Sequence, residues 1–149
     1  MGRAIRNSAK ALIFKNGRMA AIKIDDAGDV FYILPGGGQD PDETLADAVV
    51  RECAEELGIA VSVKDLAFVI EGMRGEPFHR VDLVFLCEYI SDIPMAALHQ
   101  DTNQIGIEWL PVAELETQPL YPSRLRRQII NVYHSRPAGI YLGDESMGS

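Results

Sequence analysis

The 149-residue chain lacks several features that would place it in a familiar class. It has no apolar run near the roughly 20 residues that span a bilayer, so we expect no membrane partner. Its two cysteines, Cys53 and Cys87, are too few for a disulfide framework and have no metal-site spacing. The N-terminus lacks the apolar stretch of a secretory signal. We therefore expect a cytoplasmic protein whose thiols are reduced and buried.

Basic residues are also scarce, with 14 Lys and Arg against 22 Asp and Glu and a formal net charge of −8 at pH 7. A phosphate backbone attracts clustered Lys and Arg, so this balance argues against a binder of nucleic acid polymers. The acid excess is still compatible with a phosphorylated small molecule, because carboxylates can recruit cations that then meet the phosphates. We expect a small-molecule partner.

Alternating and clustered apolar residues predict a series of strands interrupted by two main helices. Without internal repeats or a linker-like composition shift, residues 1–149 are expected to form one domain, with 136–149 as a loosely ordered tail. An Asn16-Gly17 pair predicts a hairpin. Strands are predicted at 8–14, 19–24, 30–34, 66–73, 81–90 and 105–110, a helical turn at 112–115 and a helix at 123–134. Such an order is typical of a mixed sheet with helices packed on it.

The stretch 45–57 has the periodicity of a helix. Its apolar stripe consists of Leu45, Val49, Cys53 and Leu57. Thr44 is a good N-cap and forms a capping-box pattern with Asp47, whereas Asp40 before Pro41 is a competing start. Gly58 ends the helix from either start.

Three carboxylates on this helix, Glu52, Glu55 and Glu56, are expected to project from a common side. Arg51 can offset part of their repulsion through Glu55, and divalent cations would complete the arrangement. Mg²⁺ suits oxygen ligands and substrate phosphates, with Mn²⁺ as a substitute. A glutamate-rich face alone is usually solvated surface. The order of strand, glycine turn, acidic loop, capped helix and acidic cluster favours a site instead.

This order matches a long signature. It reads Gly37, five residues, Glu43, seven residues, Arg51-Glu52, two residues, Glu55-Glu56, one residue, Gly58 and Ile59. The pattern resembles the Nudix box of the Nudix (MutT-like) hydrolases. The similarity continues through the preceding strand and the later Trp109-Leu110-Pro111, and covers most of residues 8–134. It implies an α/β fold in which a mixed sheet lies between helices, an α/β/α sandwich.

The resemblance also implies a role for each matching residue. The implied metal ligands are Gly37 (through its carbonyl), Glu52, Glu55 and Glu56. Glu43 and Arg51 would form an ion pair that orients the ligands. The reaction would be attack of a metal-bound water on a diphosphate linkage of a nucleoside diphosphate derivative, such as a nucleoside triphosphate, ADP-ribose or a nucleotide sugar.

The chain departs from the family pattern at three positions. Cys53 replaces a larger aliphatic residue, Asp42 replaces a common glycine, and Asn103 stands where many members carry a glutamate that is a candidate base. The base therefore stays open among Glu55, Asp101, Asp82 and Glu76.

Substrate contacts and two other functions also stay open. Tyr32 could stack on a base or belong to the core, and Arg74 and Arg80 could hold a terminal phosphate or be ordinary loop charges. One alternative function is a Nudix-fold module that senses a nucleotide without cleaving it. Another is an isomerase that needs a catalytic cysteine, which the apolar settings of both cysteines disfavour. Homodimers are common in the family, but no pattern in this chain requires one.

Overall fold

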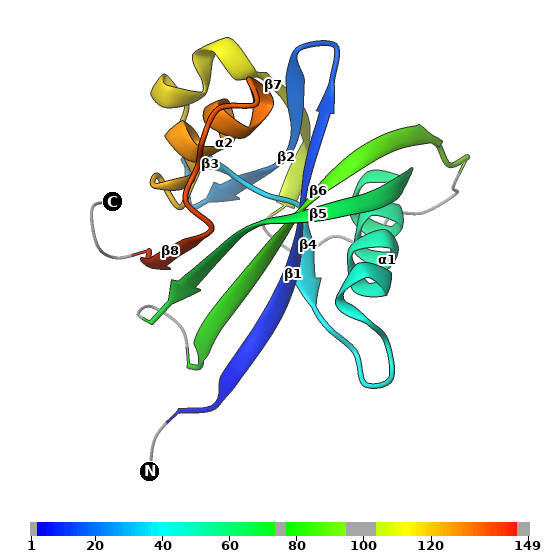
Figure 1. Ribbon diagram of the computed structural model, residues 1–149, viewed down its shortest axis with the longest axis vertical. Helices are drawn as coiled ribbons and strands as arrows, with labels where there is room; N and C mark the ends of the chain where they lie inside the picture. Colours follow the sequence, from blue (N-terminus) through cyan, green and yellow to red (C-terminus); the bar gives the residue numbers. More distant parts are fainter. Residues whose placement is uncertain (1–2, 74–76, 95–103, 146–149) are drawn as a thin grey trace.

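One mixed sheet carries the helices of this chain on its two faces (Figure 1). The computed structural model describes residues 3–73, 77–94 and 104–145. In chain order the elements are β1 (Ile5–Lys15), β2 (Arg18–Asp26), β3 (Asp29–Ile33), β4 (Gly36–Gly38), α1 (Leu45–Leu57), β5 (Ile59–Gly72), β6 (His79–Asp92), β7 (Gln104–Pro111), the 3₁₀ helix η1 (Val112–Thr117), α2 (Leu125–Tyr133) and β8 (Tyr141–Asp144). Every predicted strand and helix is present.

The sheet has the strand order β3-β2-β1-β6-β5-β8, while β4 pairs with β1 and β7 pairs with β2. The β1–β6 and β5–β8 pairs are parallel and the remaining pairs are antiparallel. The predicted hairpin joins β1 to β2, and both of its turn residues, Asn16 and Gly17, have positive φ angles of 53° and 75°. Such a turn matches the right-handed twist of the two strands.

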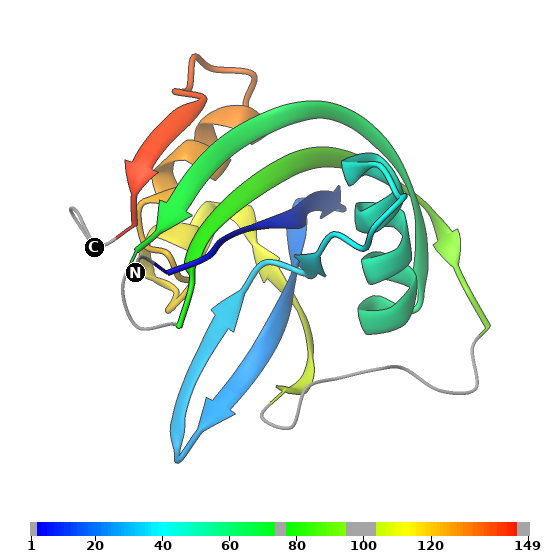
Figure 2. The ribbon, with the colours of Figure 1, turned by 90° about the horizontal axis from the view of Figure 1, so that it is seen from below.

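Two separate apolar cores hold the layers together. One core joins Ala9, Ala11 and Ile13 of β1 to the buried stripe of α1, and the other joins Leu12 to residues of η1 and α2. Accordingly, α1 and α2 lie to either side of β1 (Figure 2). The α/β/α sandwich expected from the sequence is confirmed. Among the described helices, none is long and apolar enough to cross a membrane.

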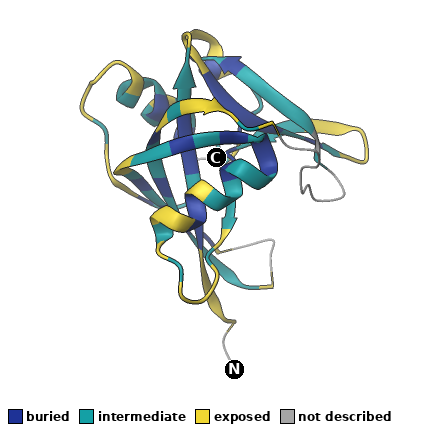
Figure 3. Cartoon of the chain, turned by 90° about the vertical axis from the view of Figure 1, so that its right-hand side faces the viewer, coloured by how far each residue is buried: buried dark blue, intermediate teal, exposed yellow. Residues whose placement is uncertain are grey.

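Helix α1 begins and ends where local side-chain chemistry places it. The Thr44 hydroxyl accepts from the Asp47 amide at 3.0 Å, and the Asp47 carboxylate accepts from the Thr44 amide at 3.3 Å. This capping box decides the start in favour of Thr44 over Pro41. Gly58 adopts a left-handed φ of 66° and ends the helix. Figure 3 shows the buried face of α1 against the sheet and its exposed face outside.

The tail contains a strand that the sequence prediction missed. Residues 136–149 were expected to be loose, yet β8 pairs in parallel with β5 through Tyr141 opposite Val69 and Asp144 opposite Glu71. Leu142 is 7% exposed and joins the core. A four-residue strand with a glycine in it gives little periodicity, so its partner and not its own sequence defines it.

Candidate active site

The glycine run after β3 forms a strand, not the tight turn that the sequence suggested. Gly36, Gly37 and Gly38 pair with residues 10, 9 and 8 of β1, and the Pro35 carbonyl accepts from the Ala11 amide at 2.9 Å. A β-carbon on Gly37 would lie 2.7 Å from Oε1 of Glu52. The absence of side chains therefore lets β4 pass closely between β1 and the carboxylates of α1.

A substitution at Gly36 is expected to disrupt this passage, whereas one at Gly38 is not. Gly36 has a φ of 140°, and an added β-carbon would lie 2.2 Å from the Ala9 carbonyl oxygen. Gly36→Ala should therefore lower the free energy of unfolding by about 3 kcal/mol or more. Gly38→Ala meets no atom within 4 Å and should change it by less than about 1 kcal/mol. Urea unfolding measures the free energy of unfolding of both variants. Equal decreases in the two variants would contradict the close packing around Gly36.

Glu56 is the most deeply placed carboxylate of the helix, with 7% of the residue exposed. Its Oε1 accepts from the Gly36 amide at 2.7 Å, and its Oε2 accepts from the Gln104 side chain of β7 at 3.3 Å. Burial raises the pKa of Glu56 to about 7, although the Gly36 hydrogen bond opposes the shift. The protein thus holds a carboxylate whose charge is only partly stabilised by its neighbours.

The other two carboxylates differ from each other in their surroundings. The Glu52 side chain is 15% exposed, and burial raises its pKa although Arg51 lies 3.0 Å away. The Glu55 side chain is 40% exposed and meets Arg51 at 3.4 Å. Among the described residues, no three carboxylate, imidazole or thiol groups form a cluster able to hold a metal ion. The common face expected for all three glutamates is therefore only partly formed: Glu52 and Glu56 turn inward and Glu55 lies at the rim.

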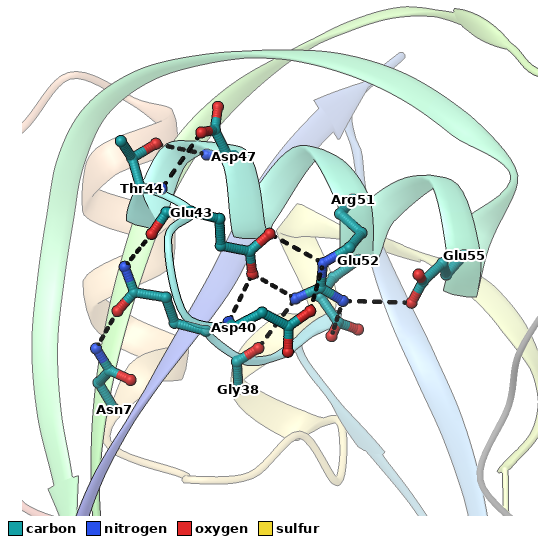
Figure 4. Close-up of polar contacts among 10 residues, drawn as sticks. Asn7, Gly38, Asp40, Glu43, Thr44, Asp47, Arg51, Glu52 and Glu55 are labelled. Carbon is teal, nitrogen blue, oxygen red and sulfur yellow. Dashed lines mark hydrogen bonds and ion pairs between the residues drawn. The ribbon is translucent and has the colours of Figure 1, made fainter.

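Arg51 links the loop before α1 to the helix (Figure 4). Its guanidinium donates from Nη2 to Glu43 Oε1 at 2.6 Å and from Nε to Glu43 Oε2 at 3.1 Å. Nη2 also donates to the Gly38 carbonyl at 3.1 Å. The hydrogen bonds that Arg51 donates to Glu43 lower the pKa of Glu43 and raise the pKa of Arg51. The clamp predicted between these residues is present, and it also ties β4 to α1.

Two of the three residues suggested for substrate contact, Tyr32 and Arg80, are engaged in contacts within the protein. The backbone of Tyr32 pairs with residues 119 and 121, and its side chain packs against the core on the α2 side. The Arg80 guanidinium contacts Asp82, at 2.9 Å, and Glu145, so its donors serve internal ion pairs. Arg74 lies outside the described residues.

Two of the four candidate bases, Glu76 and Asp101, also lie outside the described residues, as does Asn103. Asp82 is 4% exposed and is held by Arg80. Its neighbour across the strand pair, Ile70, belongs to the core on the α2 side, so Asp82 faces away from α1. Of the described candidates, Glu55 is the one at the rim of the acidic face.

Sequence reasoning missed two residues on other elements that lie near the acidic face. Gln104 contacts Glu56 although it lies 48 residues later in the sequence, and no sequence pattern predicts this contact. Lys10 lies on β1 beside Gly36. A signal existed for Lys10, because it interrupts the apolar run of its strand.

Comparison with known proteins gives consistent matches. The family model described as NUDIX domain matches residues 5–131. A MutT-like protein of Streptomyces ambofaciens is 33% identical over 109 residues, which cover 72% of this chain and 64% of that protein. A protein named mutator protein MutT4, of Mycobacterium tuberculosis, is 29% identical over 121 residues, which cover 75% of this chain and 46% of that protein. The chain thus matches between about half and two thirds of the length of these relatives.

A solved structure agrees with these matches. The crystal structure of a MutT NUDIX hydrolase from Burkholderia pseudomallei superposes with a TM-score of 0.68 at 28% sequence identity. The superposition covers 85% of this chain and 98% of the other. The order and packing of the elements described above are therefore those of a known hydrolase fold.

Proposed function

The chain belongs to the Nudix family, and from this premise we propose that it is a Mg²⁺-dependent hydrolase that cleaves a diphosphate linkage. The candidate substrates are nucleoside diphosphate derivatives: nucleoside triphosphates, ADP-ribose and nucleotide sugars. The observation that carries the proposal is the pair of inward-facing carboxylates, Glu52 and Glu56, packed against the side-chain-free strand β4. We further propose that one domain contains the whole site.

The donor set fits a hard divalent cation. Mg²⁺ typically takes one or two protein carboxylates and completes its shell with waters and substrate phosphates, so it needs no closed cluster of three side chains. Glu52 and Glu56 supply the carboxylates, and burial raises the pKa of both. A metal ion in this place would stabilise their charged forms.

The backbone oxygen of the proposed site belongs to β4, where the carbonyl of Gly36 is a second candidate beside that of Gly37. In an antiparallel pair the N–H and C=O of one residue point to the same side, and successive residues alternate. The Gly36 amide points at Glu56, which brings Gly36 to the edge of β4 nearest this carboxylate. Gly37 lies opposite Ala9, at the alternate position, where its backbone groups face β1.

Other residues of the site would position the metal ligands and accept a proton. Arg51 and Glu43 fix the loop and the helix relative to each other, which holds the ligands in place. Glu55, at the rim and 40% exposed, would accept the proton of the attacking water. A bound divalent cation would supply two things: a lower pKa for water and neutralisation of charge on the leaving phosphate.

The alternative functions have less support. A sensing module has no need of the intact set of box carboxylates present in this chain. An isomerase would need a reactive cysteine, but Cys53 and Cys87 are 0% and 4% exposed. Burial raises the pKa of both thiols, that of Cys87 to about 11, which disfavours the reactive thiolate.

A substrate panel tests the proposal. Purified protein is incubated with nucleoside triphosphates, ADP-ribose, nucleotide sugars and dinucleoside polyphosphates, with Mg²⁺ or with EDTA, and products are separated by anion-exchange chromatography. We expect cleavage within the diphosphate of at least one class, and only with the cation present. Tight nucleotide binding without cleavage across the panel would overturn the hydrolase in favour of the sensing module.

A further inference from the structure

Two successive glycines leave strand β4 bare on both faces. A β-carbon on Gly37 would meet Glu52, and a β-carbon on Gly36 would lie 2.7 Å from Cα and 2.9 Å from Cδ of Lys10. Ala9, the neighbour of Lys10, is buried in the core under α1. Because successive side chains of a strand point to opposite faces, Lys10 leaves β1 on the face away from α1. Lys10 and Glu52 therefore approach the same short strand from opposite sides.

The charge of Lys10 influences two carboxylates of the acidic face. Its positive charge acts on both Glu52 and Glu56 and opposes the effect of burial on the pKa of each. Within the described residues, however, Lys10 has no ion pair within 4 Å. Arg51, by contrast, contacts Asp40, Glu43, Glu52 and Glu55. Lys10 thus keeps its three N–H donors available beside the carboxylates.

We propose that Lys10 binds a non-bridging phosphate oxygen of the diphosphate, which lies at the edge of β4 between this lysine and the carboxylates of α1. The inference rests on the proposed function, because it takes the acidic face as a diphosphate site. A lysine is a compact charge on a flexible stem and is well suited to phosphate oxygens. The stem runs along Gly36, where only glycine leaves room for it. Cation and lysine would then neutralise the diphosphate from opposite sides.

A different role for Lys10 makes a different prediction. If Lys10 only balances the charge of Glu52 and Glu56 in the folded protein, its removal would strengthen metal binding and leave phosphate binding unchanged. If it binds phosphate, its removal would weaken phosphate binding, whether or not the metal binds more tightly. The two affinities therefore separate the roles.

The test uses Lys10→Met, which keeps the length of the stem and removes the charge. Mn²⁺ affinity is measured by electron paramagnetic resonance, and the affinity for methylenediphosphonate, a diphosphate that resists hydrolysis, is measured by calorimetry with Mn²⁺ present. We expect methylenediphosphonate to bind about 10–100-fold more weakly to the variant and Mn²⁺ to bind equally or more tightly. Lys10→Arg should retain most of the affinity. Lys64→Met removes an exposed lysine that pairs with Glu88 and should match the wild type.

The outcomes distinguish a wrong phosphate contact from a wrong proposed function. Unchanged methylenediphosphonate affinity in Lys10→Met, with tighter Mn²⁺, overturns the phosphate contact and leaves the proposed function standing. Failure of the wild-type protein to bind methylenediphosphonate with Mn²⁺ present overturns the proposed function and the contact together. Should Lys10→Met not fold, as judged by circular dichroism, Lys10→Gln is measured in the same way.

Discussion

Replacing Glu56 with glutamine is expected to abolish hydrolysis while it stabilises the metal-free protein above neutral pH. The carboxylate is a proposed metal ligand, and its loss should lower kcat at least about 100-fold. Its effect on stability has the opposite sign, because burial raises the pKa of the folded form from 4.5 to about 7. A group with a raised pKa contributes stability below about pH 4.5, and that contribution is lost as the pH rises through about 7.

The stability part of this prediction is measured without metal. By pH 8 the buried charge should cost the wild-type protein up to about 3 kcal/mol relative to acidic pH. The glutamine cannot ionise and has nearly the same shape, although its amide nitrogen donates where a carboxylate oxygen accepted. Urea unfolding in EDTA at pH 5 and pH 8 should therefore show a larger loss for the wild type than for Glu56→Gln. Wild-type turnover in the variant would contradict the assignment of this residue to the metal site.

A matched control separates the site from the loss of one negative charge. Glu116 has a side chain that is 51% exposed and pairs with Arg127 on the surface. Glu116→Gln removes the same charge and should leave kcat unchanged and the free energy of unfolding within about 0.5 kcal/mol. A loss of activity in this control would mean that net charge, rather than the position of Glu56, determines turnover.

Helix α1 could be predicted from the sequence, with its end fixed and its start narrowed to two candidates, because its determinants are local. The capping box joins residues three positions apart, and the apolar stripe repeats every four. The hairpin at Asn16-Gly17 was predictable for the same reason, since the required positive φ angles select those residues. The clamp between Glu43 and Arg51 followed from the family signature, and the structure adds its bidentate geometry.

The elements that the sequence did not reveal depend on distant partners. The glycines of β4 have no strand propensity of their own, and β4 exists because β1 supplies the hydrogen bonds. In the same way, β8 depends on β5. The inward turn of Glu56 depends on an amide 20 positions earlier and on Gln104, 48 positions later. Helical spacing indicates which face a side chain leaves from, but not what it meets there.

Arg51 is expected to show the second large effect, because one guanidinium contacts five groups. Arg51→Ala removes its contacts to Gly38, Asp40, Glu43, Glu52 and Glu55. It should lower kcat/KM by about 10–100-fold and the free energy of unfolding by about 1–3 kcal/mol. The exposed Arg127, which pairs with Glu116, provides the control. Arg127→Ala should change the free energy of unfolding by less than about 0.5 kcal/mol and leave kcat/KM unchanged.

Arg51→Lys distinguishes the geometry of this clamp from its charge. Lysine keeps the positive charge, but it cannot present the fork that reaches both oxygens of Glu43 together with the Gly38 carbonyl. We therefore expect kcat/KM for Arg51→Lys to stay near that of Arg51→Ala. A cycle with Glu43→Gln should be non-additive, because either change alone already releases the loop from the helix. Wild-type kcat/KM in Arg51→Lys would show that the charge alone is sufficient and that the bidentate pair does not position the ligands.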